Sequence, residues 1–250
     1  MWKYKDYIIY SVKAKLLTET INNHLGLLWL ILDPILKMFV FYFVFVYLIK
    51  RRTEDFTSFL LIGLIAFQWF SKSVMQGGNS IQKSQKLMEQ LHLPKIIFPT
   101  ISFAVRTIEF LIILTLLMVY FVLRGHFYIT WLAIPAVFLT QLFFVYGVTL
   151  FFAAVIPFIP DLSFLLSSAL TALMFLSGVI YRVTPDNPQY NLFMLNPLAK
   201  LFEQYRTVIL YGQWPEWSSL SIICGIGIAL IVAMSRFLKK HDCYYPRLVR

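Results

Sequence analysis

Charged side chains are scarce in this sequence. Asp, Glu, Lys and Arg make up 14% of the 250 residues, against roughly 25% in soluble globular domains. Hydrophobic residues make up 59%, aromatic residues 18%, and the mean hydropathy is +0.72. So few charges cannot cover a water-facing surface, which excludes a soluble enzyme, a disordered tail and a secreted disulfide scaffold. The composition predicts a protein that crosses a membrane several times.

Cysteine and histidine are also rare. Two cysteines, Cys224 and Cys243, are too few for a disulfide framework. On one helix they would lie about 28 Å apart, far beyond disulfide reach. The four histidines are scattered and have no metal-ligand spacing. We therefore expect no metal site and no cofactor in this chain.

Motifs of catalysis are missing as well. The sequence has no G-x-x-x-x-G-K-[ST] phosphate loop and no G-x-S-x-G elbow. Asp186 stands between prolines without an acid or base partner nearby in sequence, and acidic clusters are absent. We therefore expect that the chain does not itself bind ATP through such a loop and is not an enzyme.

Apolar stretches of about 20 residues, the length that crosses a bilayer, dominate the rest of the chain. They predict an all-α integral membrane protein in which 1–250 form a single transmembrane domain. The six expected transmembrane helices are 27–49, 56–76, 96–123, 131–157, 162–181 and 217–238.

The basic residues lie near the ends of these stretches, so the net charge of +10 needs no nucleic-acid partner. With the N-terminus inside, 13 Lys and Arg lie on the inner side and 7 on the outer side. The inner ones are Lys3, Lys5, Lys13, Lys15, Lys72, Lys83, Lys86, Lys95, Arg236, Lys239, Lys240, Arg247 and Arg250. The outer ones are Lys50, Arg51, Arg52, Arg124, Arg182, Lys200 and Arg206. This bias predicts a multi-pass protein of the cell inner (cytoplasmic) membrane with both termini cytoplasmic.

The N-terminal segment, 1–26, carries an apolar residue at every fourth position. These residues are Tyr4, Ile8, Val12 and Leu16. Their spacing predicts a helix lying on the cytoplasmic membrane surface. Lys15 and Glu19 interrupt the apolar face, and a frayed leader is the alternative.

The connection 79–94, NSIQKSQKLMEQLHLP, is polar and helix-forming with one apolar side. It predicts a short cytoplasmic helix that ends at Pro94 and docks on another protein, and a solvated loop is the alternative.

The connection 182–215 contains four prolines and apolar runs too short to span. It predicts short re-entrant helices in the outer leaflet. Within it, Glu203 and Arg206 have i,i+3 spacing, so they either pair locally or hold this segment against a neighbour. The alternative is an outer loop with a solvated ion pair.

Two further pairs of opposite charge fall inside predicted spans. Asp33 and Lys37 have i,i+4 spacing, and Arg106 and Glu109 have i,i+3 spacing. Charges within a span are costly and face protein or water. Each pair therefore either lines a translocation channel or neutralises itself.

Several stretches together resemble one family. Residues 25–34 (LGLLWLILDP) are similar to the LGxLWxxLxP signature of polysaccharide ABC-2 permeases, and 59–71 (FLLIGL followed by FS) to their second span. Residues 79–81 and 93–99 (LPKIIFP) resemble their coupling loop, and 196–212 their outer NPxxxxxExxR segment. The resemblance covers nearly the whole chain in the expected order.

This resemblance implies a homodimer of six-span subunits bound to two copies of a separate ATPase, which holds ATP and Mg²⁺. It implies that a lipid-linked polysaccharide of the capsule, O-antigen or teichoic acid type passes through a channel along the dimer axis, where aromatic rings stack on sugars. The residues implied in ATPase coupling are Ser80, Lys83, Leu87, Leu91, Leu93 and Asp161. The channel or gate residues implied are Trp29, Asp33, Lys37, Arg106, Glu109, Tyr181, Glu203 and Arg206.

Two alternatives remain at this point. An ABC-2 permease for a smaller lipid or a drug would keep the fold and the ATPase partner. A membrane-embedded enzyme acting on lipid-linked sugars would need a titratable cluster near one interface, which the sequence does not contain. The segment 158–161 also departs from the family pattern, because it lacks the Arg that often precedes Asp161.

Overall fold

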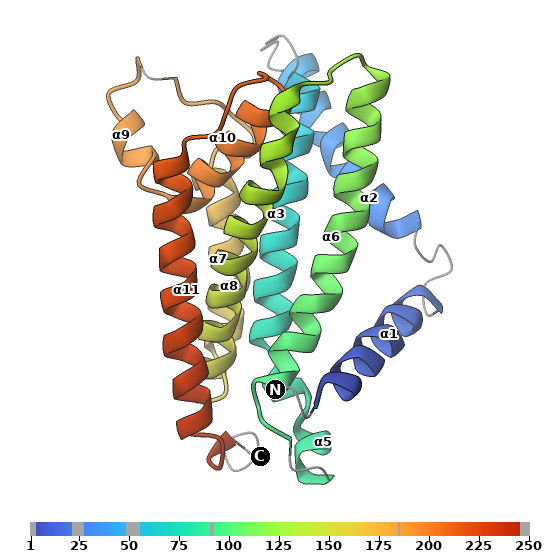
Figure 1. The fold of residues 1–250 in the computed structure, drawn as a ribbon, viewed down its shortest axis with the longest axis vertical. Helices are drawn as coiled ribbons and strands as arrows, with labels where there is room; N and C mark the ends of the chain where they lie inside the picture. Colours follow the sequence, from blue (N-terminus) through green and yellow to red (C-terminus); the bar gives the residue numbers. More distant parts are fainter. Residues whose placement is uncertain (1–3, 22–27, 49–55, 91–92, 185, 246–250) are drawn as a thin grey trace.

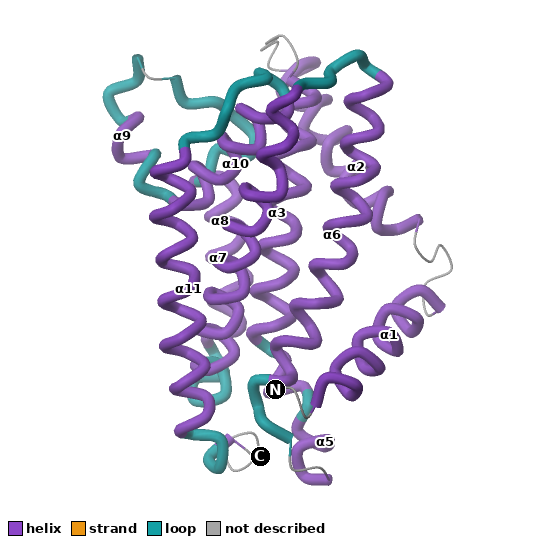
Figure 2. Tube along the Cα trace, in the orientation of Figure 1, coloured by secondary structure: helices purple, strands orange, loops and turns teal. Residues whose placement is uncertain are grey.

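The computed structural model describes residues 4–21, 28–48, 56–90, 93–184 and 186–245, and these contain helices but no strand (Figure 2). The long helices run side by side, and their connections gather at the two ends of the bundle (Figure 1). The all-α prediction is therefore confirmed for the described part of the chain.

The helices follow the order expected from the apolar stretches. In chain order they are α1 (Lys5–Ile21), α2 (Leu28–Tyr42), the π-helix η2 (Phe43–Leu48), α3 (Phe56–Gly78), α4 (Ser80–Lys83), α5 (Gln85–Gln90), α6 (Ile97–Leu123), the 3₁₀-helix η3 (Ile129–Ala133), α7 (Ile134–Val155), α8 (Leu162–Leu176), α9 (Tyr190–Phe193), α10 (Pro197–Ile209) and α11 (Trp217–Lys240).

Four helices in the described residues are long and apolar enough to cross a membrane. They are Phe56–Gly78, Ile97–Leu123, Ile129–Val155 and Trp217–Lys240. All four overlap predicted spans. The predicted span 27–49 corresponds to α2 and η2, but both of its predicted ends lie outside the described residues.

Helix α8 ends at Leu176, although the sequence predicted a span that continues to Tyr181. The chain leaves the helix through Gly178, whose φ of 61° lies in the left-handed region that favours glycine. Residues 178–181 are apolar or aromatic, so hydropathy alone does not reveal this turn.

The connection 79–94 is also broken where one helix was expected. Helix α4 ends at Lys83, the following Ser84 adopts a non-helical conformation, and α5 begins at Gln85. Residues 93–94 have no regular structure. The described part of the segment therefore contains two short helices instead of one.

Helix α3 forms the centre of the bundle, because most of its residues are buried. Helices α7 and α11 make the most extensive contact of any described helix pair. A Cβ atom on Gly227 would lie 2.6 Å from the Phe144 nitrogen, and one on Gly147 would lie 2.8 Å from the Gly227 oxygen. The two glycines therefore let the backbones of these helices approach closely, as small residues do in membrane proteins.

The two ends of the bundle carry different elements. Helices α1 and α5 and the end of α11 lie at one end, and α9 and α10 lie at the opposite end (Figure 1). The segments predicted to be cytoplasmic thus gather at one end, which is called the α5 end below. The predicted outer segment lies at the other.

Candidate functional site

The first polar cluster joins α1 to α6. Arg106, on α6, is only 6% exposed. Its Nη1 group donates to both carboxylate oxygens of Glu109, at 2.8 and 2.6 Å, and its Nη2 group donates to Glu19 of α1. The pair expected from the sequence is therefore confirmed as a contact, but it is not self-contained. Two carboxylates from two helices pair with one buried guanidinium, which offsets the cost of burying its charge.

The polar residues of α1 meet partners on the same neighbour. Val12 is buried in a cluster with Ile101 of α6, and the other residues of the predicted apolar face pack around this cluster. Lys15 Nζ donates to Ser102 Oγ at 3.1 Å. Lys15 and Glu19, which interrupt the apolar face in the sequence, thus contact polar groups of α6.

A second polar cluster joins α2 to α3. The carboxylate of Asp33 accepts from Lys37 Nζ at 2.9 Å and, through its other oxygen, from Lys72 Nζ at 2.9 Å. Lys37 has a side chain that is 46% exposed, whereas Asp33 is more enclosed. Asp33 therefore serves as the acceptor that ties two helices together, and the ammonium group of Lys37 contacts it from a partly exposed side chain.

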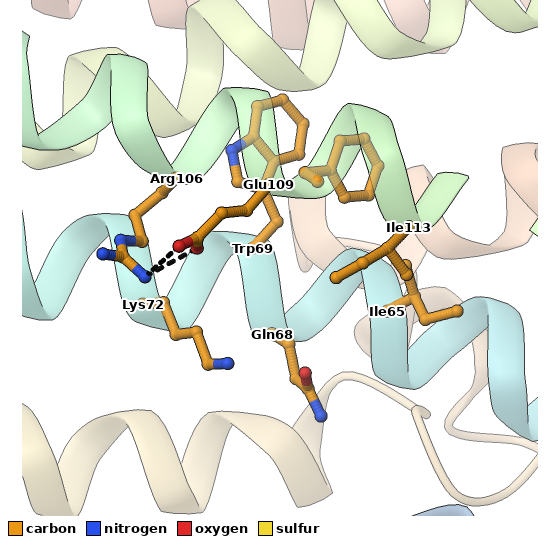
Figure 3. A pocket seen from close by; sticks show the side chains of 8 residues that line it. Ile65, Gln68, Trp69, Lys72, Arg106, Glu109 and Ile113 are labelled. Atoms are coloured by element: carbon orange, nitrogen blue, oxygen red, sulfur yellow. Dashed lines mark hydrogen bonds and ion pairs between the residues drawn. The ribbon is translucent and has the colours of Figure 1, made fainter. Parts of the chain in front are cut away.

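A small cavity separates the two clusters. It lies between α3 and α6, has a volume of about 20 Å³, and is bordered by Gln68, Trp69 and Lys72 from α3 and Arg106 and Glu109 from α6 (Figure 3). Three donors around it, Gln68 Nε2, Trp69 Nε1 and Arg106 Nε, are buried without a hydrogen-bond partner among the described residues. The volume suits one water molecule, which needs at least about 10–15 Å³. It is too small for a sugar ring.

An aromatic stack extends from this cavity into the core. Trp69 stacks on Phe110 with ring centroids 4.2 Å apart and on Phe138 with centroids 5.4 Å apart. Trp69 is only 3% exposed, so the stack packs the helices together and leaves no face for a sugar. Exposed aromatic residues instead occur on α2, including Trp29 and Phe39.

A third site lies at the end of the bundle that carries α10. Arg206 is 3% exposed. Its Nε donates to the Phe59 carbonyl at 3.3 Å, and its Nη2 donates to the carbonyls of Gly178 and Val179 at 3.1 and 3.2 Å. The guanidinium also lies 3.4 Å from the Phe59 ring centroid. The alternative of a solvated Glu203–Arg206 pair is therefore wrong, because Arg206 is buried and its Nη1 is 3.8 Å from Glu203.

Two neighbouring residues make room for this arginine and position it. A Cβ atom on Gly63 of α3 would lie 2.5 Å from Arg206 Nη2, so only glycine fits there without displacing the guanidinium. Asn196 caps α10, because its Oδ1 accepts from the Leu198 amide at 2.9 Å, and its Nδ2 donates to Ser177 Oγ at 2.9 Å. Asn196 thus joins the start of α10 to the end of α8, and Arg206 joins α10 to α3.

Glu203 approaches this arginine, and Tyr181 lies two residues after Val179, whose carbonyl accepts from Arg206. Tyr181 is exposed and its ring centroid is 6.2 Å from that of Phe193 on α9. Glu203 is partly exposed and lies 3.9 Å from Arg182. The structure therefore brings Tyr181, Glu203 and Arg206 together at one end, whereas Arg106 and Asp33 belong to the two clusters described above.

The residues implied in ATPase coupling differ in exposure. Ser80 is buried and its hydroxyl donates to the Gly77 carbonyl at 2.6 Å, and Leu93 is buried in the cluster that also holds Val12. Leu87 packs partly against the same cluster. These side chains therefore contribute to the chain's own packing.

Other coupling residues are accessible. Lys83 on α4 is exposed, as is Asp161 in the link between α7 and α8. Lys86 on α5, which was not among the implied coupling residues, is exposed as well. Leu91 lies outside the described residues. Among the implied coupling residues that the structure describes, the exposed ones are thus charged, whereas Leu87 and Leu93 pack within the chain.

The tail after α11 connects these links. Asp242 Oδ1 accepts from the Lys95 amide at 2.9 Å. The buried Tyr245 donates through its hydroxyl to the Ala154 carbonyl at 3.1 Å. The tail therefore holds the link before α6 next to the end of α7, close in sequence to Asp161. The sequence analysis missed these contacts, because nothing in the polar tail distinguishes Asp242 or Tyr245 from solvated residues.

Comparisons with known proteins agree with this architecture. The family model described as ABC-2 type transporter matches residues 9–210. The chain is 26% identical over 240 residues to the O-antigen export system permease protein RfbA of Myxococcus xanthus, which covers 94% of this chain and 92% of that protein. It is 23% identical over 239 residues to a protein of the same name from Klebsiella pneumoniae, with the same coverage.

A second kind of relative is named for a capsule polymer. The chain is 26% identical over 204 residues to the polysialic acid transport protein KpsM of Escherichia coli, which covers 80% of this chain and 79% of that protein. The family model covers well over half of the chain, and the resemblance noted from the motifs is confirmed. This chain belongs to the ABC-2 type transporter family of membrane proteins.

Proposed function

We propose that this chain is the membrane-spanning permease subunit of an ATP-driven exporter that moves a lipid-linked polysaccharide across the cytoplasmic membrane. The similarity over 94% of its length to a protein named as an O-antigen export permease carries this proposal. The relative named for polysialic acid transport supports the same class of substrate. The polysaccharide is of the capsule, O-antigen or teichoic acid type.

A six-span topology completes the proposal. The first span consists of α2 and η2, and the fifth span is α8. The other four spans are the four longer helices. Both termini are cytoplasmic, with α1 at the inner membrane surface. Helices α9 and α10 enter the outer leaflet without crossing it. Their irregular backbone is compatible with that depth because Asn196 and Arg206 satisfy carbonyls and amides there.

The permease works as a homodimer whose subunits meet along α2 and α8. Helix α8 buries only Leu166 and Leu170 within its own chain, although most of its residues are apolar. Its exposed positions include Ser167 and Ser168, and α2 exposes Lys37. Polar and charged groups at membrane depth face protein or a watery path rather than lipid. These two helices are therefore the ones to border a channel between subunits, together with the exposed aromatic residues of α2.

A separate ATPase, present in two copies, binds ATP and Mg²⁺ and docks on the α5 end. The accessible charges Lys83, Lys86 and Asp161 suit a polar protein interface. The tail contacts made by Asp242 and Tyr245 hold the link before α6 and the end of α7, which lies close in sequence to Asp161. A movement of the docked ATPase would thereby displace α6 and α7 together.

Export is tested in cells that lack the permease gene. We expect surface polysaccharide to disappear and lipid-linked polysaccharide to accumulate inside, and the intact chain to reverse both changes. The measurement is immunoblotting of surface and cytoplasmic fractions. Normal surface polysaccharide in the deletion strain would contradict the proposal. Loss of polymer synthesis itself, without accumulation, would favour an enzyme instead.

Docking of the ATPase is tested with matched charge reversals. Asp161→Lys changes the exposed link at the α5 end, and Asp186→Lys makes the same change in the exposed connection at the opposite end. We expect Asp161→Lys to reduce co-purification of the ATPase and its stimulated hydrolysis, while Asp186→Lys leaves both intact. Equal behaviour of the two variants would contradict docking at the α5 end.

A further inference from the structure

A polar cavity lies between α1 and the ends of α3 and α4. Its volume is about 330 Å³, and every residue that lines it is polar. The lining residues are Lys15, Glu19, Gln76, Ser80, Lys83, Ser84 and Ser102. The volume is at the lower end of the range for small-ligand sites, about 300–1,000 Å³. The lining thus brings two lysines, a glutamate, a glutamine and three serines to one cavity.

The charges around this cavity favour an anion. The carboxylate of Glu19 is already engaged by the Arg106 guanidinium. Neither Lys15 nor Lys83 belongs to an ion pair between described residues. Lys15 Nζ instead donates to the neutral Ser102 hydroxyl. The ammonium groups of Lys15 and Lys83 therefore border one cavity, and the carboxylate that lines it, Glu19, is paired with Arg106.

The electrostatics of Lys15 agree with this arrangement. Burial lowers the pKa of its ammonium group, and the nearby charges of Arg106 and Lys83 act in the same direction, whereas Glu19 and Glu109 oppose them. A bound anion would offset this desolvation. The Ser102 oxygen accepts from Lys15, which leaves its hydroxyl hydrogen to donate to a ligand oxygen.

We propose that this cavity binds the phosphate group of an anionic lipid headgroup at the inner membrane surface. Lys15 and Lys83 supply the positive charge, and the Ser102 hydroxyl supplies a hydrogen bond. Phosphate fits because its several acceptor oxygens match ammonium and hydroxyl donors that converge from three helices. The inference rests on the proposed function in one respect, since a headgroup reaches the cavity only if α1 lies at the membrane surface.

The test measures binding to the purified full-length chain in a neutral detergent by isothermal titration calorimetry. The probes are short-chain phosphatidylglycerol, short-chain phosphatidylcholine and inorganic phosphate. We expect phosphatidylglycerol to bind more tightly than phosphatidylcholine. Lys15→Gln and Lys83→Gln should each raise its Kd about tenfold, the effect of losing one charge-assisted hydrogen bond. Lys83 is exposed, so its variant leaves the packing of α1 intact even if Lys15→Gln disturbs it.

Lys13→Gln is the matched control, because Lys13 is exposed on the same helix and does not line the cavity. It should leave the Kd unchanged. Inorganic phosphate that binds with the same dependence on Lys83 would support the phosphate site and identify free phosphate as its source. Equal weakening by Lys13→Gln and Lys83→Gln, or equal binding of phosphatidylcholine, would overturn the site.

The binding measurement tests the lipid site independently of the proposed permease function. Binding in detergent requires neither the ATPase nor transport. If Lys83→Gln and the parent chain bind phosphatidylglycerol equally, and the parent chain restores export to the deletion strain, the site is refuted and the permease function stands. If the site binds as expected but deletion of the gene leaves export normal, the permease function is refuted.

Discussion

The buried arginine of α10 offers the most decisive test of how this chain is held together. Arg206 donates to the carbonyls of Phe59, Gly178 and Val179 over 3.1–3.3 Å. Hydrogen bonds to a charged group contribute about 1.5–3 kcal/mol each, and the lower value applied to these three bonds gives about 4–5 kcal/mol. Proteins are stable by about 5–15 kcal/mol in total. Arg206→Ala should therefore remove a large share of the free energy of unfolding.

The chain provides a matched control in Arg182. Arg182 has a side chain that is 53% exposed, and it lies 3.9 Å from the same Glu203 that Arg206 approaches at 3.8 Å. An exposed pair of this kind contributes about 0–1 kcal/mol. Arg182→Ala should therefore leave stability nearly unchanged. The stability of Arg206→Lys should lie between those of Arg206→Ala and Arg182→Ala. An ammonium keeps the charge but lacks the planar set of donors with which a guanidinium reaches separate carbonyls.

The assay is unfolding of the purified permease in mixed micelles, monitored by tryptophan fluorescence, with surface polysaccharide measured at matched permease abundance. The reasoning predicts a lower unfolding midpoint for Arg206→Ala and an unchanged midpoint for Arg182→Ala. Equal midpoints would refute the role of Arg206 as a structural clamp. Loss of export at an unchanged midpoint would instead assign it to a gate.

Three further predictions concern other parts of the bundle. Glu109→Ala should destabilise the chain by about 3 kcal/mol in the same unfolding assay. This is the lower end of the range for removing one partner of a buried ion pair, because a second carboxylate still contacts the guanidinium. An unchanged unfolding midpoint would contradict this. Gly227→Val should cost about 1–3 kcal/mol through overpacking, since a Cβ there meets a backbone nitrogen at 2.6 Å, and wild-type stability would show that the helices separate freely. Single cysteines at Ser11 and Asn187, in a cysteine-free background, should react with membrane-impermeant reagent from opposite sides, and labelling from one side would overturn the six-span topology.

The sequence predicted those features that depend on local spacing. The four-residue period before Leu16 anticipated the buried side of α1, and the i,i+3 and i,i+4 spacings anticipated the contacts of Arg106 with Glu109 and of Lys37 with Asp33. Long apolar runs located the four longest helices. In each case, the regular geometry of a helix converts sequence separation directly into distance.

Features that depend on distant partners were not predictable in this way. Glu19 reaches Arg106 and Lys72 reaches Asp33 only because different helices pack together, and no spacing in a single sequence encodes that contact. The early end of α8 has a similar cause. Its following residues are apolar, but the Gly178 and Val179 carbonyls leave the helical pattern to accept from Arg206. Hydropathy records the side chains and not the direction of the backbone.

These contacts separate the bundle into a fixed part and a part with little support of its own. Helix α3 is held by Arg206 at its Phe59 carbonyl and by Gln141 at its Ala66 carbonyl, where Nε2 donates over 3.0 Å. Helix α8 buries two side chains within the chain. Segments with few buried contacts open at the lowest free energy. If the proposed function holds, a substrate path that widens for a polymer is expected along α8 and α2, while α3 keeps the rest of the subunit in place. The ion pair between Asp33 and Lys72 then limits how far α2 can move from α3.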